Sequence, residues 1–141
     1  MAEIYVVLPL TAKVVEELVA LGISHPEPLA HTQSPSPRQV LTVVADLPEM
    51  RVTVSRLPDK QWIRIDLTPA RYGRQRPAGS GTEVNLSGVT DDETPCEIAF
   101  RGGTTELVAF LTRRIAAACG PQVIFPASGA DPLVCVGEQI P

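Results

Sequence analysis

The segment from Cys96 to Pro126, CEIAFRGGTTELVAFLTRRIAAACGPQVIFP, constrains the fold of this 141-residue chain more than any other. A short apolar run is followed by a Gly-Gly turn, by apolar residues at helical spacing, by a Gly-Pro stop and by a second apolar run. These patterns predict a strand over 96–100, a helix over 104–119 and a strand over 122–125. The expected buried stripe of the helix comprises Leu107, Val108, Leu111, Ile115 and Cys119.

The first 22 residues, MAEIYVVLPLTAKVVEELVALG, follow the same order of elements as the first half of this unit. An apolar run over 4–8, ended by Pro9, predicts a buried strand, and apolar residues at helical spacing predict a helix over 12–21. Thr11 is placed to cap that helix and Gly22 to end it. The two strand-helix units therefore suggest a β-α pseudo-repeat.

The middle of the chain predicts short antiparallel strands. Alternating apolar and polar residues predict strands over 39–47, 51–56 and 61–67, and further runs predict strands over 83–89 and 132–136. The segments 23–38 and 68–82 are expected to be loops, and 137–141 a frayed tail. About eight short strands and two helices indicate a single α+β domain over residues 1–141, with a mostly antiparallel sheet and both helices packed on one face.

Composition excludes several classes of function and favours a cytoplasmic protein. A formal net charge of −4 argues against nucleic acid or an anionic membrane as the main partner. No segment approaches the about 20 apolar residues of a membrane-spanning helix, and no basic region of a signal peptide precedes the first strand. The three cysteines, Cys96, Cys119 and Cys135, are odd in number and far apart, so they predict neither a disulfide framework nor a CxxC site. The excess of arginine over lysine is typical of a GC-rich bacterial genome.

The turn Gly102-Gly103-Thr104-Thr105, which follows Arg101 between a strand and a helix, is the nearest approach to an anion site. Backbone N–H groups and the helix dipole favour a phosphate or carboxylate at such a place. The chain holds neither a GxGxxG nor a GxxxxGK[ST] motif. We therefore favour a tight turn with a helix cap, and keep anion binding as the alternative.

The only basic cluster lies in the second long loop and consists of Arg71, Tyr72, Arg74 and Arg76. Arginine recognises carboxylates and phosphates through two parallel hydrogen bonds, and both Arg and Tyr are frequent at the centres of protein interfaces. The simpler interpretation is a solvated loop. Long loops without structure of their own are nevertheless often functional, so this cluster is a candidate partner-binding segment.

Trp62 and Arg64 are expected on the strand face opposite the apolar side chains of 61–67. If that face is open, they form a binding patch; the alternative, in which Trp62 packs under a loop, is equally compatible with the sequence. Asp91 and Asp92 belong to an acidic turn, which is most simply a capped turn and alternatively a patch that faces a basic partner.

Residues for metal binding or catalysis are not indicated. His25 and His31 lie in the proline-rich loop at a spacing that matches no common zinc site, and no cysteine pair accompanies them. No GxSxG elbow or other nucleophile motif occurs, so we expect no catalytic residues, no metal and no cofactor.

These observations lead to three hypotheses about function. The first is a small cytoplasmic bacterial protein that binds another protein, as an inhibitor or an immunity-type protein of a toxin-antitoxin pair neutralises its partner, and that is not an enzyme. The second is a small ligand-binding domain or enzyme that holds an anionic substrate at Gly102–Thr105 and Arg71–Arg76. The third is a homodimer that pairs through an edge strand such as 132–136.

Overall fold

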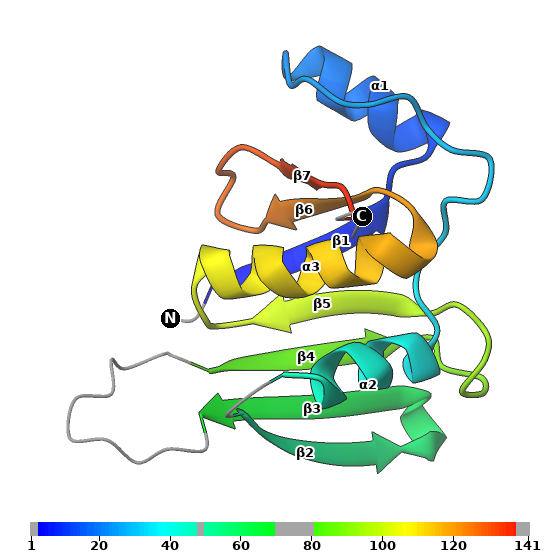
Figure 1. The fold of residues 1–141 in the computed structure, drawn as a ribbon, viewed down its shortest axis with the longest axis vertical. Coiled ribbons are helices and arrows are strands. Elements are labelled where there is room, and N and C mark those ends of the chain that lie inside the picture. Colours follow the sequence, from blue (N-terminus) through cyan, green and yellow to red (C-terminus); the bar gives the residue numbers. More distant parts are fainter. Residues whose placement is uncertain (1–2, 48–49, 70–80, 138–141) are drawn as a thin grey trace.

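A computed structural model describes residues 3–47, 50–69 and 81–137 of the chain, apart from the side chain of Pro58. Seven strands form one antiparallel sheet in the order β2-β3-β4-β5-β1-β6-β7 (Figure 1). The strands are β1 (Ile4–Pro9), β2 (Met50–Leu57), β3 (Trp62–Pro69), β4 (Thr82–Ser87), β5 (Glu97–Arg101), β6 (Gln122–Pro126) and β7 (Leu133–Cys135). Because β1 lies between β5 and β6, the first strand joins the middle and the last part of the chain into one sheet.

The helices of the described residues are α1 (Ala12–Ala20), α2 (Pro37–Ala45) and α3 (Thr105–Cys119), with a short 3₁₀ turn, η1 (Pro58–Lys60). The predicted α+β class is confirmed. The helix α3 begins and ends as its sequence predicts: the Thr104 hydroxyl accepts a hydrogen bond from the Leu107 N–H, and Gly120 stops the helix with a φ of +87°. None of the described helices has the length and apolar character that crossing a membrane requires.

The prediction of a strand over 39–47 is wrong, because residues 39–45 belong to α2 and Asp46 caps its end. Ser36 and Gln39 form a capping box, in which the Ser36 hydroxyl accepts from the Gln39 N–H at 3.3 Å and the Gln39 side chain accepts from the Ser36 N–H at 2.9 Å. Pro37 at the first helical position needs no partner for an N–H. Val40 and Val44, four residues apart, are the buried face of the helix. The chain therefore has three helices in its described part, and one strand fewer than the eight expected.

The main core lies between one face of the sheet and the helices α2 and α3, which lie in front of it in Figure 1. The strand register places every second residue of the central strands on this face. The buried side chains contributed by β1, β3, β4 and β5 are Tyr5, Val7, Ile63, Ile65, Leu67, Val84, Leu86, Ile98 and Phe100. The alternation that predicted β3 and β5 is therefore the alternation between this core and the opposite face.

The helix α1 packs on the other face of the sheet, so the prediction that it shares a face with the helix of 104–119 is wrong. Its Val14 and Leu18 form a second, smaller core with Leu10 and with Val123 of β6. Val123 lies opposite Leu8 in the register and so points away from the main core. The two strand-helix units consequently place their helices on opposite faces, and their packing is not repeated.

Candidate functional site

Five neighbouring strands present a face that no described helix covers. The open face is the side of β2, β3, β4, β5 and β1 opposite to α2 and α3, and α1 packs beside it, over β6 and β7. The register assigns to the central part of this face Ile4, Val6, Leu8, Trp62, Arg64, Asp66, Glu83, Asn85, Ala99 and Arg101. Each of these side chains is exposed or only partly buried. The open face therefore offers a continuous surface built on rigid strands.

The half of the open face on β3 and β4 is polar and held in one arrangement by hydrogen bonds. The Trp62 indole N–H donates to the Asn85 side chain at 3.0 Å, and the Asn85 amide donates to the Glu83 carboxylate at 3.0 Å. Arg64 pairs with Glu83 at 2.6 Å and with Asp66 at 3.3 Å. Because each residue orients the next, Trp62 and Arg64 are fixed before any partner arrives.

The other half of the open face is apolar and lies on β1. Ile4, Val6 and Leu8 keep 44%, 39% and 36% of their surface exposed. Val6 stands between Ala99 and Phe125, both partly buried, so the stripe continues sideways to the edge of α1. Clustered apolar side chains at the surface of a soluble protein are a common mark of an interaction site.

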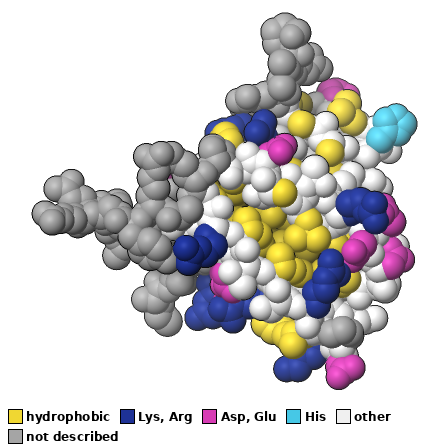
Figure 2. All heavy atoms as spheres, turned by 60° about the horizontal axis from the view of Figure 1, so that its bottom comes forward, with side chains coloured by type: hydrophobic (Ala, Val, Ile, Leu, Met, Phe, Trp, Pro, Cys, Tyr) yellow, Lys and Arg dark blue, Asp and Glu magenta, His cyan; other side chains and the backbone are white. Residues whose placement is uncertain are grey.

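A separate apolar region lies on the helix side of β2. Val52 and Val54 face the same side as Leu67 and Ile65 of β3, but keep 36% and 40% of their surface exposed, whereas these two neighbours are almost fully buried. Four partly buried side chains from α2, from the segment just after it and from the start of β2 pack against the same core; they are Leu41, Val43, Leu47 and Met50. Figure 2, turned so that the β2 edge comes forward, shows hydrophobic side chains gathered in the middle of this side, with charged groups beside them.

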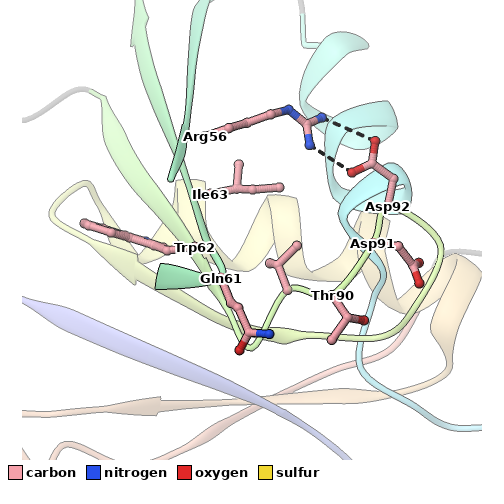
Figure 3. A pocket seen from close by; sticks show the side chains of 8 residues that line it. Arg56, Gln61, Trp62, Ile63, Thr90, Asp91 and Asp92 are labelled. Atoms are coloured by element: carbon pink, nitrogen blue, oxygen red, sulfur yellow. Dashed lines mark hydrogen bonds and ion pairs between the residues drawn. The ribbon is translucent and has the colours of Figure 1, made fainter. Parts of the chain in front are cut away.

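A hollow of about 240 Å³ lies at the end of the sheet, between β2, β3 and the loop 88–95 (Figure 3). Its lining residues are Arg56, Gln61, Trp62, Ile63, Val89, Thr90, Asp91 and Asp92. The Arg56 guanidinium donates to both carboxylate oxygens of Asp92, at 2.9 and 3.4 Å. The ring of Trp62 points away from this ion pair, toward the open face.

The loop 88–95 owes its shape to two aspartates. The Asp91 carboxylate accepts from the N–H groups of Glu93 and Thr94 and from the Thr94 hydroxyl, each at 2.8 Å. These hydrogen bonds, above all that of the hydroxyl, lower the pKa of Asp91. The pKa of Asp92 is lowered chiefly by its hydrogen bond with Arg56. Both carboxylates therefore act first as structural acceptors, and the predicted capped turn at Asp91 is confirmed.

The turn after β5 is held by hydrogen bonds to neighbouring segments of the chain. The Gly102 N–H donates to the Glu3 carbonyl at 2.8 Å, and the Thr82 hydroxyl donates to the Gly102 carbonyl at 2.9 Å. Gly103 has a φ of +86°, and a Cβ added there would lie 2.9 Å from the Thr82 Cβ. Thr104 caps α3, as the favoured interpretation expects. Anion binding at 101–104 remains a prediction, with Arg101 turned to the open face opposite Glu83.

The three thiols are buried, and two of them donate weak hydrogen bonds, Cys96 to the Pro35 carbonyl at 3.5 Å and Cys119 to the Gln39 side chain at 3.3 Å. Burial raises the pKa of Cys96 and of Cys135 to about 11, and raises that of Cys119. Because the thiolate is the reactive form, the thiols of these residues are poor nucleophiles and metal ligands at neutral pH. Over the described ranges, no three or more His, Cys, Asp and Glu side chains are grouped as a metal ion would need.

The structure brings the predicted site residues together in part. Trp62 and Arg64 share the polar half of the open face, while Asp91 and Asp92 lie in the loop at the end of the sheet. Arg71, Tyr72, Arg74 and Arg76 lie outside the described residues. His25 and His31 both lie in the segment that joins α1 to α2, and the His25 Nδ1 is 2.9 Å from the Pro26 carbonyl oxygen.

Sequence reasoning missed the apolar stripe on β1. The run IYVVL is apolar at every position, which predicts burial on both faces. The usable signal was the small number of helices, since too few helices leave part of a wide sheet uncovered.

Comparisons with protein-family models, with curated proteins and with solved structures find no match to this chain.

Proposed function

We propose that this chain is a small cytoplasmic bacterial protein that acts by binding another protein, in the manner of an inhibitor or an immunity-type protein that neutralises a toxin or an enzyme. The observation that carries the proposal is the open face, where β1 presents the exposed stripe of Ile4, Val6 and Leu8. On the same face, with β4 and β5 between, β3 presents the pre-arranged pair of Trp62 and Arg64. The partner lies against this face.

The chemistry of the open face suits a protein partner better than a small ligand. Protein interfaces combine an apolar centre with a polar rim and are enriched in tryptophan and arginine. A standard interface takes about 800 Å² from each partner, about a tenth of the 8590 Å² surface of this chain. The exposed side of a broad sheet supplies such an area, whereas small ligands are usually held in concave pockets.

Rigidity also favours this use of the face. Since Trp62 and Arg64 are held by Asn85 and Glu83 in the free protein, they lose little freedom on binding. The open face carries arginines and carboxylates in alternation, which gives a partner both signs of charge to match.

The test is co-purification of the tagged chain from its own cell, or with the product of a neighbouring toxin-like gene. Val6→Lys and Leu8→Lys each place a charge in the apolar stripe, and we expect both to abolish recovery of a stoichiometric partner. Leu133→Lys is the matched control, because Leu133 is a strand leucine that is 39% exposed, close to the 36% of Leu8, and faces the opposite side of the sheet.

A stoichiometric partner that both lysine variants still recover would contradict the proposal. Thermal stabilisation by nucleotides or phosphorylated metabolites, with no protein partner, would favour the anion-binding alternative instead.

A further inference from the structure

The two edges of the sheet differ in how well they are protected against pairing with another chain. The edge strand β7 spans three residues, whereas β2 at the other edge spans eight. The β2–β3 register runs without interruption from Met50 opposite Pro69 to Leu57 opposite Trp62, so no bulge twists this edge away. Natural sheets usually protect long edges with prolines, lysines, charged side chains or bulges. The centre of β2, the sequence Val-Thr-Val-Ser over 52–55, has none of these.

We propose that two copies of this chain pair through β2, antiparallel and about a two-fold axis at Thr53, to form one continuous sheet. A two-fold axis that exchanges adjacent antiparallel strands must be perpendicular to the sheet. Side chains on the helix side of one copy therefore meet side chains on the helix side of the other. A register is allowed only if residues that lie opposite each other point to the same side of the sheet. A slip of one residue would place helix-side residues of one copy opposite open-side residues of the other.

The register with Thr53 on the axis fits the sequence of β2 best. It places Val52 of each copy opposite Val54 of the other, and Thr53 opposite its own counterpart. Cross-strand pairs of β-branched side chains stabilise a sheet. The next register of the same length, centred on Val54, would place Arg56 opposite Val52.

The pairing also explains the exposed apolar side chains beside this edge. Val52 and Val54 lie on the helix side at 36% and 40% exposure, and the partly buried Val43, Leu47 and Met50 pack against the core of the same side. In the dimer the four valines would form one apolar row between the two α2 helices. The arginines of β2 would face Ser55 and Met50 of the other copy, so no like charges would stand directly opposite.

The edge pairing is distinct from the protein partner proposed above, which lies on the open face and leaves the free backbone edge of β2 available. Because strand pairing alone buries less than a standard interface, which is about 1,600 Å² over both partners, we expect a dimer that dissociates on dilution. Sedimentation equilibrium from about 1 μM to about 1 mM should therefore show a monomer-dimer equilibrium.

The position of the axis gives a sharper test. Thr53→Lys places two introduced lysines directly opposite each other, and Thr53→Glu does the same with two carboxylates. We expect each variant alone to be monomeric over the whole range, and an equimolar mixture of the two to dimerise at least as well as the unmodified chain. Ser87→Lys is the matched control, since Ser87 is an exposed hydroxyl residue on the open side of the interior strand β4 and should leave dimerisation unchanged.

Circular dichroism and thermal unfolding of each variant establish that it is folded. The proposal is wrong if the unmodified chain is monomeric throughout, if Thr53→Lys still dimerises, or if the mixture of folded variants fails to pair. If the unmodified chain is monomeric, the edge of β2 remains available for pairing with a strand of a different protein. None of the three results tests partner binding at the open face.

Discussion

Arg56 and Asp92 form a two-pronged ion pair, with nitrogen-oxygen distances of 2.9 and 3.4 Å, that ties the edge strand β2 to the loop between β4 and β5. The same loop is joined to α2, because the Arg38 N–H donates to the Asp92 carbonyl and the Arg38 side chain pairs with Glu93 at 2.5 Å. One short loop thus connects the helix layer with the outermost strand.

Asp92 should make stability depend on acid. Its pKa is lowered in the folded chain, mainly by Arg56, so the stabilisation is complete above the ordinary pKa of 3.8 and is lost as the pH falls through the lowered value. Both side chains are exposed to solvent, so the effect should be small. Urea unfolding between pH 6 and about pH 2 should show a shallower loss of stability for Asp92→Asn than for the unmodified chain. An identical pH dependence for the two proteins would refute this role.

The two threonine caps should differ in their contribution to stability. The Thr104 hydroxyl accepts from the Leu107 N–H at 3.1 Å, whereas the Thr11 side chain, at the same position of α1, makes no capping hydrogen bond. Thr104→Ala should lower the free energy of unfolding by about 1 kcal/mol, and Thr11→Ala by much less. Chemical denaturation measures both, and equal losses would count against the assigned caps.

Alanine substitutions at Gly103 and at Gly88 distinguish two causes of lost stability, steric crowding of the new Cβ and the backbone conformation. Both have positive φ, +86° and +67°, but a Cβ at Gly103 would lie 2.9 Å from the Thr82 Cβ, and one at Gly88 would meet nothing within 4 Å. Gly88→Ala should carry only the conformational cost, on the order of 1 kcal/mol, and Gly103→Ala should be clearly more destabilising. The comparison is made by thermal unfolding, and a Gly88→Ala variant as unstable as Gly103→Ala would disprove it.

The cysteines should resist modification in the folded protein. Burial raises the pKa of Cys96 and Cys135 to about 11, so almost no thiolate is present at pH 8. Iodoacetamide at pH 8 should label none of the three thiols in native protein and all three in denaturant, as counted by mass spectrometry. Rapid labelling of native Cys96 would show that this part of the core opens.

Local patterns in the sequence were sufficient to predict α3, β3 and β5. At these places the helix cap at Thr104, the stop at Gly120 and the strict alternation of Trp62–Leu67 agree with the tertiary structure. The prediction for 39–47 was wrong because its apolar residues alternate as in a strand; they are Leu41, Val43, Ala45 and Leu47. The stronger signal was the capping box that joins Ser36 to Gln39, the first residue of the segment.

The residues of the candidate site were predictable only where the alternation of apolar and polar residues along a strand determines which side each side chain faces. Trp62 and Arg64 lie opposite Ile63 and Ile65, as their positions in the strand require. The number of helices indicated that part of the sheet stays uncovered, but not that Val6 lies in the uncovered part. That depends on which face α1 covers, and no local pattern determines this choice.

The separate core beneath α1 has a consequence for the motions of the protein. Since Leu10, Val14, Leu18 and Val123 are divided by the sheet from the main core, α1 can detach while β1 to β6 and α3 stay folded. We expect the amide hydrogens of α1 to exchange well before those of α3, and equal protection of the two helices would contradict this. Each such opening would expose Val123, which lies opposite Leu8 in the register, to solvent. The exposed apolar surface beside β1 would then be larger for a short time, and α1 would control its exposure.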